Sequence, residues 1–119
     1  MTNHRVSRGR ATQEFLAARL RALGLVHARS RAASLPGADI EGVAGLYIEV
    51  KGTERAEPMR WTRENAAKAG HALPFVVYRG RGQGPANLDD WVMMLRWADG
   101  EQLLREAGYF TEGMGEAAG

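Results

Sequence analysis

Hydrophobic and polar residues alternate over residues 46–51, which read Leu-Tyr-Ile-Glu-Val-Lys. The side chains of a β-strand point to opposite faces in turn, so this alternation predicts a strand with its three aliphatic residues toward a core. Glu49 and Lys51 would then lie together on the opposite face. Residues 39–43 precede this segment, and the turn at residues 43–45 predicts that the two segments form a hairpin that ends at Gly52.

Three further segments carry the spacing or the end signals of helices. Apolar residues recur at helical spacing over residues 10–23, and Gly24 follows as a stop signal. Pro58 is favourable in the first turn of a helix, and it opens a predicted helix over residues 58–69 that Gly70 ends. Asp99 is expected to cap a last helix that runs to residue 107.

Strands besides the hairpin are expected over residues 25–29, 74–78 and 91–95. The run 74–78, Pro-Phe-Val-Val-Tyr, is continuously apolar and indicates a buried strand, whereas residues 88–97 also fit a helix. Loops are expected over residues 30–36 and 79–85, a frayed terminus over residues 1–7 and a disordered tail over residues 113–119. The order α-β-β-β-α-β-β-α predicts an α/β fold with a mixed central sheet of about five strands flanked by helices.

The chain of 119 residues is expected to form one domain over residues 1–112, because it is too short for a second hydrophobic core. It contains no cysteine, which excludes a disulfide framework and a cysteine-based zinc site. No apolar run has the length of a membrane span, and no signal-peptide pattern opens the sequence. A cytoplasmic protein without membrane association is therefore expected.

Positive charge is concentrated in the N-terminal third of the chain. Residues 1–38 carry seven arginines against the single acid Glu14, a net charge of +6, whereas the whole chain carries +2. The remaining residues must therefore sum to −4. A basic segment of this kind is typical of a surface that binds a polyanion such as nucleic acid, although an amphipathic helix with solvated arginines gives the same composition.

Asp39, Glu49 and Lys51 have the clearest potential for chemistry. The hairpin would bring Asp39 alongside Glu49, and two carboxylates at the end of a sheet form an oxygen site suited to Mg²⁺ or Mn²⁺. Lys51 is one of only two lysines among sixteen basic residues, and its compact ammonium can stabilise charge on a phosphate in a tight pocket. The set predicts a metal-dependent phosphodiesterase; the alternative is a pattern of surface charges across two strands.

The spacing of these three residues resembles the PD-(D/E)XK nuclease superfamily: Asp39, nine intervening residues, then Glu49, one residue and Lys51. Residues 7–14, Ser-Arg-Gly-Arg-Ala-Thr-Gln-Glu, narrow the resemblance to the archaeal and phage Holliday junction resolvases, which share a basic residue, a glycine and a glutamate in the first helix. The chain departs from the name-giving pattern at the proline, which stands three positions before Asp39 instead of directly before it.

The resemblance implies a restriction-endonuclease-like fold and hydrolysis of phosphodiester bonds assisted by one or two divalent ions. Asp39, Glu49, the carbonyl of Val50 and, from the first helix, Glu14 would hold Mg²⁺ or Mn²⁺. Lys51 would orient the attacking hydroxide or stabilise the charge of the pentacovalent phosphorane. Judged by its position alone, Glu14 could equally be a solvent-facing helix residue.

Contacts with DNA are expected from basic side chains near this site, namely Arg5, Arg8, Arg10, Arg31 and Lys68. The resemblance implies a structure-selective DNA endonuclease, most simply a Holliday junction resolvase. A four-way junction has two-fold symmetry, so a homodimer is expected. The alternatives are a restriction-like, nicking or repair endonuclease of the same superfamily, a nucleic-acid-binding module without catalysis, and a metal-binding structural domain.

Overall fold

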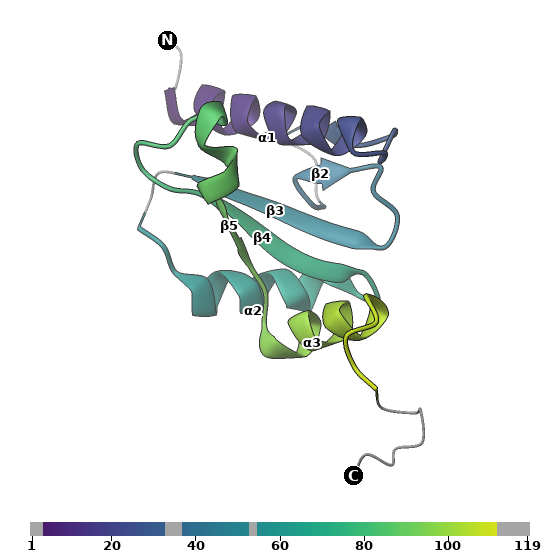
Figure 1. Ribbon diagram of the computed structural model, residues 1–119. Coiled ribbons are helices and arrows are strands. Elements are labelled where there is room, and N and C mark those ends of the chain that lie inside the picture. Colours follow the sequence, from purple (N-terminus) through teal and green to yellow (C-terminus); the bar gives the residue numbers. More distant parts are fainter. Residues whose placement is uncertain (1–3, 33–36, 53–54, 112–119) are drawn as a thin grey trace.

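The computed structural model of the protein describes residues 4–32, 37–52 and 55–111, and of residues 4–8 only the backbone. They form a five-stranded sheet flanked by helices (Figure 1). The helices are α1 (His4–Ala22), α2 (Pro58–Ala69), α3 (Trp97–Glu106) and the 3₁₀ helix η1 (Pro85–Asp90). The strands are β1 (Arg29–Ser30), β2 (Ile40–Glu41), β3 (Leu46–Gly52), β4 (Leu73–Arg79) and β5 (Val92–Met94). The predicted α/β fold with a mixed five-stranded sheet is confirmed.

The strands lie in the order β1-β2-β3-β4-β5, so neighbours in the chain are also neighbours in the sheet. β3 and β4 are parallel, whereas the other three pairs are antiparallel. Parallel neighbours need a crossover connection, and α2 supplies it. β3 and β4 run side by side from Leu46 opposite Leu73 to Gly52 opposite Arg79, so their carboxyl ends meet at one end of the sheet.

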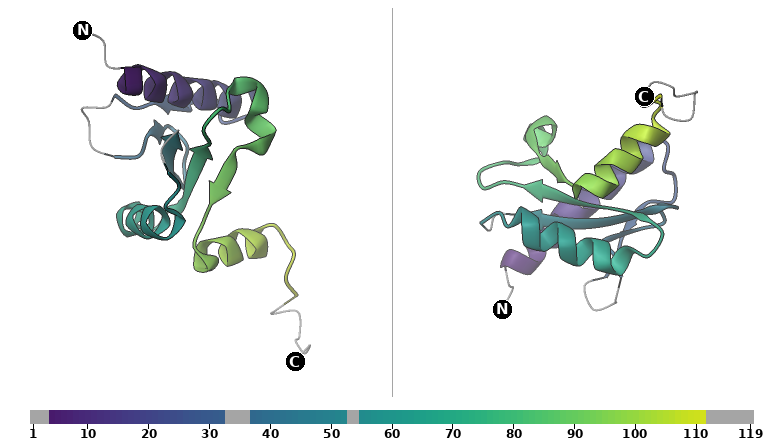
Figure 2. Two further views of the ribbon diagram at one scale, coloured as in Figure 1. Left: turned by 90° about the vertical axis from the view of Figure 1, so that its left-hand side faces the viewer. Right: turned by 90° about the horizontal axis from the view of Figure 1, so that it is seen from below.

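α1 covers one face of the sheet, and α2 and α3 lie over the other (Figure 2). Because strand side chains alternate, the buried Ile48 points toward α1, and its neighbours Tyr47 and Glu49 point toward α2. In β4, Phe75 and Val77 belong to the core under α1 by the same alternation. The two faces of the sheet are therefore covered by different helices.

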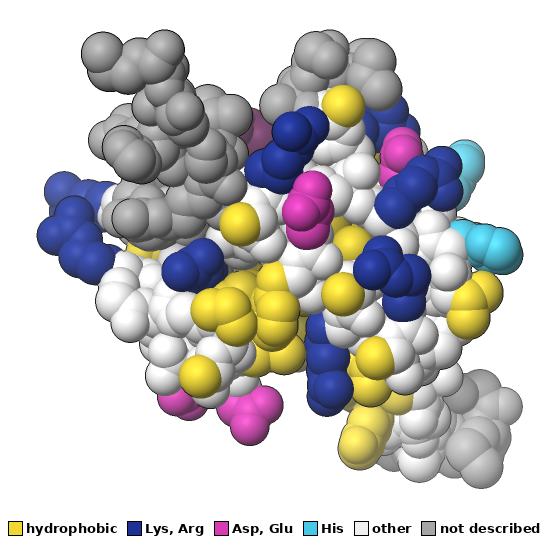
Figure 3. All heavy atoms as spheres, turned by 90° about the horizontal axis from the view of Figure 1, so that it is seen from above, with side chains coloured by type: hydrophobic (Ala, Val, Ile, Leu, Met, Phe, Trp, Pro, Cys, Tyr) yellow, Lys and Arg dark blue, Asp and Glu magenta, His cyan; other side chains and the backbone are white. Residues whose placement is uncertain are grey.

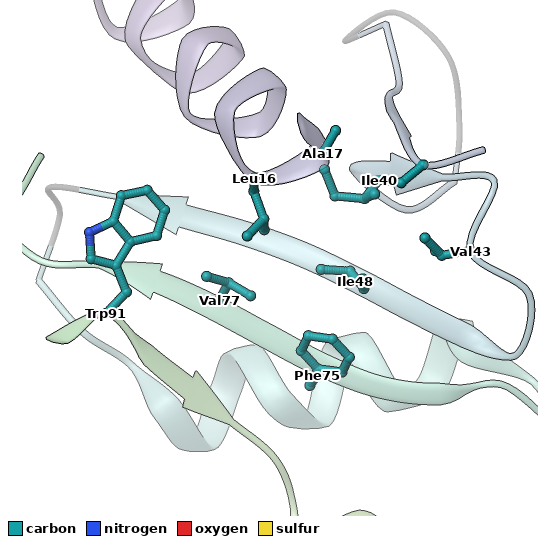
Figure 4. Packing of buried hydrophobic residues seen from close by; sticks show 9 residues of the cluster. Leu16, Ala17, Ile40, Val43, Ile48, Phe75, Val77 and Trp91 are labelled. Atoms are coloured by element: carbon teal, nitrogen blue, oxygen red, sulfur yellow. The ribbon is translucent and has the colours of Figure 1, made fainter. Parts of the chain in front are cut away.

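The main hydrophobic core lies between α1 and the sheet (Figure 4). Phe15 of α1 contacts the ring of Trp91, with the ring centroids 5.6 Å apart. Removal of this apolar surface from water is the main favourable contribution to folding, and it holds α1 on the sheet. The buried cluster consists of Leu16, Ala17, Ala28, Ile40, Val43, Ile48, Phe75, Val77 and Trp91.

The central elements have the bounds that the sequence predicts, or nearly so. β3 extends over the alternating segment, and β4 includes the apolar run with one residue added at each end. α2 has the predicted bounds, with Pro58 at its first position. It ends at Gly70, whose φ of +62° is accessible to glycine at little cost.

The N-terminal elements differ from the prediction. α1 begins at His4, so the expected start at residue 10 and the frayed terminus over residues 4–7 are wrong. Most of the strand predicted over residues 25–29 is absent, because these residues form turns after α1. The amide of Leu25 binds the carbonyl of Leu20 at 2.9 Å, and that of Ala28 binds Leu25 at 3.0 Å. Strand pairing begins only at Arg29, opposite Glu41.

The C-terminal elements also differ from the prediction. The strand predicted over residues 91–95 exists as the shorter β5, which pairs with β4, so the alternative of a helix over residues 88–97 is wrong. Arg96, and not Asp99, occupies the position before the first turn of α3. Both carboxylate oxygens of Asp99 instead accept hydrogen bonds from the Arg96 guanidinium, at 2.8 and 3.1 Å.

Two predictions about the ends of the chain stay predictions. Residues 113–119, the predicted tail, lie outside the described residues, and the single domain over residues 1–112 stays a prediction. Within the described residues, no helix combines the length and the hydropathy needed to cross a membrane.

Candidate active site

Asp39 lies directly before β2, beside the middle of β3. Its amide donates to the carbonyl of Ile48 at 3.0 Å, and its own carbonyl accepts from the amide of Arg31 at 2.8 Å. Its carboxylate oxygen Oδ2 accepts a 2.7 Å hydrogen bond from the amide of Val50. Hydrogen bonds to an ionised acceptor are stronger than neutral ones, so this bond fixes the direction of the Asp39 carboxylate. That carboxylate interacts with Glu49.

Glu49 reaches Asp39 because of the alternation along β3. The pKa of Glu49 is raised to about 7, first by burial and then by the charge of Asp39 and a hydrogen bond between the two carboxyl groups. The positive charges of Lys68 and Lys51 act in the opposite direction. The two carboxylates repel each other when both are ionised, and a proton or a cation between them relieves this repulsion.

Lys51 lies two residues beyond Glu49 on the same face of β3. Its Nζ is 5.6 Å from the centroid of the Trp61 ring, which α2 buries against the sheet. Trp61 also contacts the ring of Tyr78 on β4, with centroids 5.5 Å apart. The ammonium of Lys51 is therefore held at the carboxyl end of β3, next to the pair of acids.

Tyr47 and Arg31 border the carboxylate pair. The pKa of Tyr47 is raised, first by burial and then by the negative charges of Glu49 and Asp39, whereas Arg31 acts in the opposite direction. The Arg31 guanidinium lies against Gly37, where an added Cβ would approach it to 2.9 Å. The absence of a side chain at Gly37 thus makes room for the Arg31 guanidinium, whose Nη2 lies 2.7 Å from a carboxylate oxygen of Glu41.

The oxygen atoms of Asp39 and Glu49 fit a hard divalent cation. Mg²⁺ and Mn²⁺ prefer carboxylate oxygens, and the two side chains present them on one face of the sheet. The raised pKa of Glu49 means that the doubly ionised pair is unfavourable by itself, so a bound cation would stabilise it. Val50 donates its amide to Asp39; coordination by the carbonyl of Val50 stays a prediction.

Glu14 is not brought to this pair. It is exposed on α1, and α1 covers the face of the sheet opposite to Glu49 (Figure 2). Across residues 4–32, 37–52 and 55–111, no three His, Cys, Asp or Glu side chains gather in a group that could hold a metal ion. In this arrangement the first helix does not supply the further acidic ligand that the resemblance implies.

The predicted DNA-contacting residues lie on both sides of the sheet. The amide of Arg31 binds the carbonyl of Asp39 while its guanidinium pairs with Glu41, and Lys68 is exposed on α2 and close enough to influence the carboxylate pair. Arg10 is exposed on α1. Side chains of Lys and Arg are spread over the surface around this helix (Figure 3). The side chains of Arg5 and Arg8 lie outside the described residues, although their backbone belongs to α1.

The N-terminal half of α1 nevertheless lies at the same end of the sheet as Lys51. Nη1 of Arg79 donates to Oγ1 of Thr12 at 2.7 Å. Arg79 is opposite Gly52, the residue that follows Lys51 in β3. Arg10 precedes Thr12 by half a turn of helix, so a polyanion that follows this end of the sheet would contact both faces.

Two residues at the site were absent from the sequence-based candidates, Tyr47 and Trp61. Tyr47 belongs to the same alternating pattern as Glu49, so the period of two could have identified it. Trp61 is distant in sequence and comes to Lys51 only through the packing of α2, and no local pattern marks it as a neighbour of the site.

Comparison with known proteins adds no identification: no protein-family model matches the chain, and neither a curated protein nor a solved structure is significantly similar to it.

Proposed function

We propose that the protein is a metal-dependent DNA endonuclease with a restriction-endonuclease-like fold, and that it cuts branched DNA such as a four-way junction as a homodimer. The observation that carries the proposal is the carboxylate pair. Asp39 and Glu49 come from separate segments of the chain to one point, and Lys51 lies on the same face of β3. Two acids and a lysine in this arrangement suit the hydrolysis of a phosphodiester.

Each side chain has a distinct task in this reaction. Asp39 and Glu49 would hold the ion, and the amide of Val50 keeps the Asp39 carboxylate in place. A bound Mg²⁺ or Mn²⁺ supplies a nucleophile at neutral pH and neutralises the charge of the scissile phosphate. Lys51 places a fixed positive charge where negative charge develops on the phosphate, and such preorganised charge lowers the barrier.

The charge distribution supports DNA as the substrate. Arginine dominates the first third of the chain, and Arg31 and Lys68 add positive charge close to the acids. Binding to DNA depends largely on the release of counterions from phosphates by such side chains. Lys68 and Lys51 act on the carboxylate pair from its own face of the sheet, and a bound cation would further reduce the repulsion between the two acids and the DNA backbone.

An exposed apolar surface on β5 and α3 supports the homodimer. β5 is an edge strand, and the solvent-facing part of this region includes Val92, Met93, Trp97, Leu104 and Tyr109. An edge strand with exposed apolar side chains is typical of a protein interface. A second copy related by a two-fold axis would place two active sites on a junction whose strands are related by the same symmetry.

The decisive experiment compares cleavage of a four-way junction with cleavage of a linear duplex in Mn²⁺. The wild type should nick the junction preferentially, and Asp39→Asn and Lys51→Ala should abolish nicking while junction binding persists. Asp89→Asn is the matched control, since Asp89 is exposed on η1. Equal cleavage of both substrates would leave a general nuclease. Binding without cleavage of either would leave a nucleic-acid-binding module.

Metal dependence provides a second test of the same proposal. Cleavage should occur with Mg²⁺ or Mn²⁺ and stop in excess EDTA. Ca²⁺ should not support it, because Ca²⁺ accepts similar oxygen ligands but with longer bonds and a looser geometry. Cleavage that continues in excess chelator would contradict the role given to Asp39 and Glu49.

A further inference from the structure

The surroundings of Lys51 contain an aromatic cluster that the reaction described above does not use. Lys51 is opposite Tyr78 in the parallel pair β3–β4. Trp61 reaches both residues from α2: its ring lies 5.6 Å from Nζ of Lys51 and 5.5 Å from the ring of Tyr78, tilted by 47°. Trp61 is only 2% exposed, so its ring has little freedom to move.

The position of Trp61 over β3 is fixed by the packing of α2. Trp61 and Asn65 are the buried residues of this helix, one turn apart on the same side. Nδ2 of Asn65 donates to the carbonyl of Tyr47 at 3.4 Å, which ties the middle of α2 to β3. The ring of Trp61 is thereby held over Lys51, the last residue of the alternating segment.

The contact with Trp61 differs from an ion pair in one important respect. A lysine ammonium has three N–H donors, and an ion pair with Glu49 would occupy at least one of them. No acidic side chain in the described part of the chain lies within 4.0 Å of the Lys51 ammonium. Attraction by an aromatic face holds the charge without an acceptor, so the donors stay available for a substrate oxygen.

We propose that Trp61, supported by Tyr78, is a positioning residue that holds the Lys51 ammonium beside the carboxylate pair and keeps its donors free for a phosphate oxygen. The proposal rests on the endonuclease function given above. A lysine side chain otherwise loses rotamer entropy when it is fixed. The Trp61 ring restricts Lys51 before substrate arrives, so less of this entropy is lost in the transition state.

The kinetic test replaces Trp61 and compares turnover with binding. Trp61→Leu should lower kcat by about tenfold, which corresponds to the usual strength of a partly desolvated cation–π contact. KM and junction affinity should stay near wild type, because Lys51 is not required for the phosphate contacts made elsewhere. Trp61→Phe should recover part of kcat, since phenylalanine keeps an aromatic face of weaker attraction.

Trp91→Leu is the matched control for the loss of a buried indole. Trp91 lies in the core under α1, on the opposite face of the sheet, and contacts Phe15 and Arg79 instead of Lys51. The Trp91→Leu variant should lose stability to a degree similar to Trp61→Leu. It should keep the wild-type kcat at a temperature well below that of unfolding. A purely structural role for Trp61 predicts the same behaviour for both leucine variants.

A spectroscopic test is independent of cleavage. The chain has only two lysines, so protein labelled with ¹³C-lysine gives two sets of side-chain NMR signals. The ε-CH₂ protons of Lys51 should be shifted upfield by the Trp61 ring relative to those of the exposed Lys68. In Trp61→Phe, which keeps most of the volume, this shift should shrink, and in Trp61→Leu it should disappear.

The outcomes separate the two proposals. A lost ring shift together with a lower kcat and an unchanged KM supports the role of Trp61. If the wild type cleaves, Lys51→Ala is inactive and both Trp61 variants keep the wild-type kcat, the positioning role is wrong and the endonuclease proposal stands. If the wild type cleaves no DNA, the endonuclease proposal fails and the role of Trp61 fails with it. An unshifted Lys51 signal in the wild type overturns the positioning role in either case.

Discussion

At the scale of single residues, Glu49 combines a functional position with a local cost to stability. Its carboxyl group has a pKa of about 7, well above the ordinary value near 4.5, because burial and Asp39 disfavour its charge. Between these two pH values the folded protein keeps a proton that the unfolded chain releases. Stability therefore decreases as pH rises through this window, and the cost of ionising Glu49 is fully present above pH 7.

Glu49→Gln should remove this dependence. At pH 8 and in EDTA, the variant should be more stable than the wild type by about 1 kcal/mol, a value reduced for solvent screening of a partly exposed group. At pH 4.5 the two proteins should unfold at the same urea concentration. Glu64→Gln is the control, since Glu64 is exposed on α2. Equal stability of wild type and Glu49→Gln at pH 8 would contradict the strained carboxylate pair.

Binding of a divalent ion should be visible in stability without any DNA. Mg²⁺ or Mn²⁺ binds only the folded pair, so it should raise the unfolding temperature, and more at pH 8 than at pH 5.5, where Glu49 keeps its proton. Asp39→Asn and Glu49→Gln should both abolish the increase. Differential scanning fluorimetry measures the effect directly. An increase of the same size in Asp39→Asn would place the ion elsewhere.

At the scale of the elements, the hairpin between β2 and β3 decides whether Asp39 reaches Glu49. Gly42 follows β2 with a φ of +79°, and an added Cβ would lie 2.0 Å from the backbone carbonyl oxygen of His27. Gly45 has nearly the same φ, +80°, but open space around it. The two glycines thus have nearly the same φ but differ in the space for a side chain.

Alanine at these two positions separates conformational strain from steric clash. Gly45→Ala should cost about 1 kcal/mol, the usual penalty for an L-residue in this region. Gly42→Ala should cost at least about 2 kcal/mol more, because the backbone of the turn that contains His27 must move. Urea unfolding of both variants measures the difference. Equal costs would mean that the turn after α1 yields easily and does not fix the hairpin.

At the scale of the whole molecule, the exposed apolar surface on β5 and α3 predicts self-association. Trp97→Lys places a charge on a side chain of this surface that is 76% exposed and should convert a dimer to a monomer at micromolar concentration, as measured by sedimentation velocity. Met59→Lys is the matched control, because Met59 is 73% exposed on α2, away from β5. If the wild type sediments as a monomer at this concentration, the proposed dimer is wrong.

The basic surface predicts a strong dependence of DNA binding on salt. Arg8→Ala combined with Arg10→Ala should reduce the slope of log affinity against log salt by about 1.8, which corresponds to two lost phosphate contacts. A four-way junction should bind more tightly than a duplex of equal length, because it presents phosphates to both halves of a dimer. Fluorescence anisotropy across a salt series measures both. An unchanged slope in the double variant would remove α1 from the binding surface.

The parts of the fold that were predicted correctly are those with a strong local signal. The alternation over residues 46–51 predicts β3, and Pro58 and Gly70 mark the bounds of α2. The errors occur where the local signal competed with the surroundings. Residues 25–28 are apolar enough for a strand, yet the end of α1 and its following turns bind their amides first. Asp99 suits a helix start by residue type, but Arg96 binds its carboxylate.

The sequence by itself determined which side chains of β3 share a face, because the period of two is a property of the extended backbone and needs no partner. It also brought Asp39 near Glu49, since a short turn leaves few ways to pair the two segments. The tertiary structure alone decided which helix covers that face. α2 packs there and places Trp61 against Lys51. α1 packs on the other face of the sheet, so Glu14 does not reach the carboxylate pair. Which helix packs on which face depends on how apolar surfaces from distant parts of the sequence fit together, and no local spacing of residues encodes this.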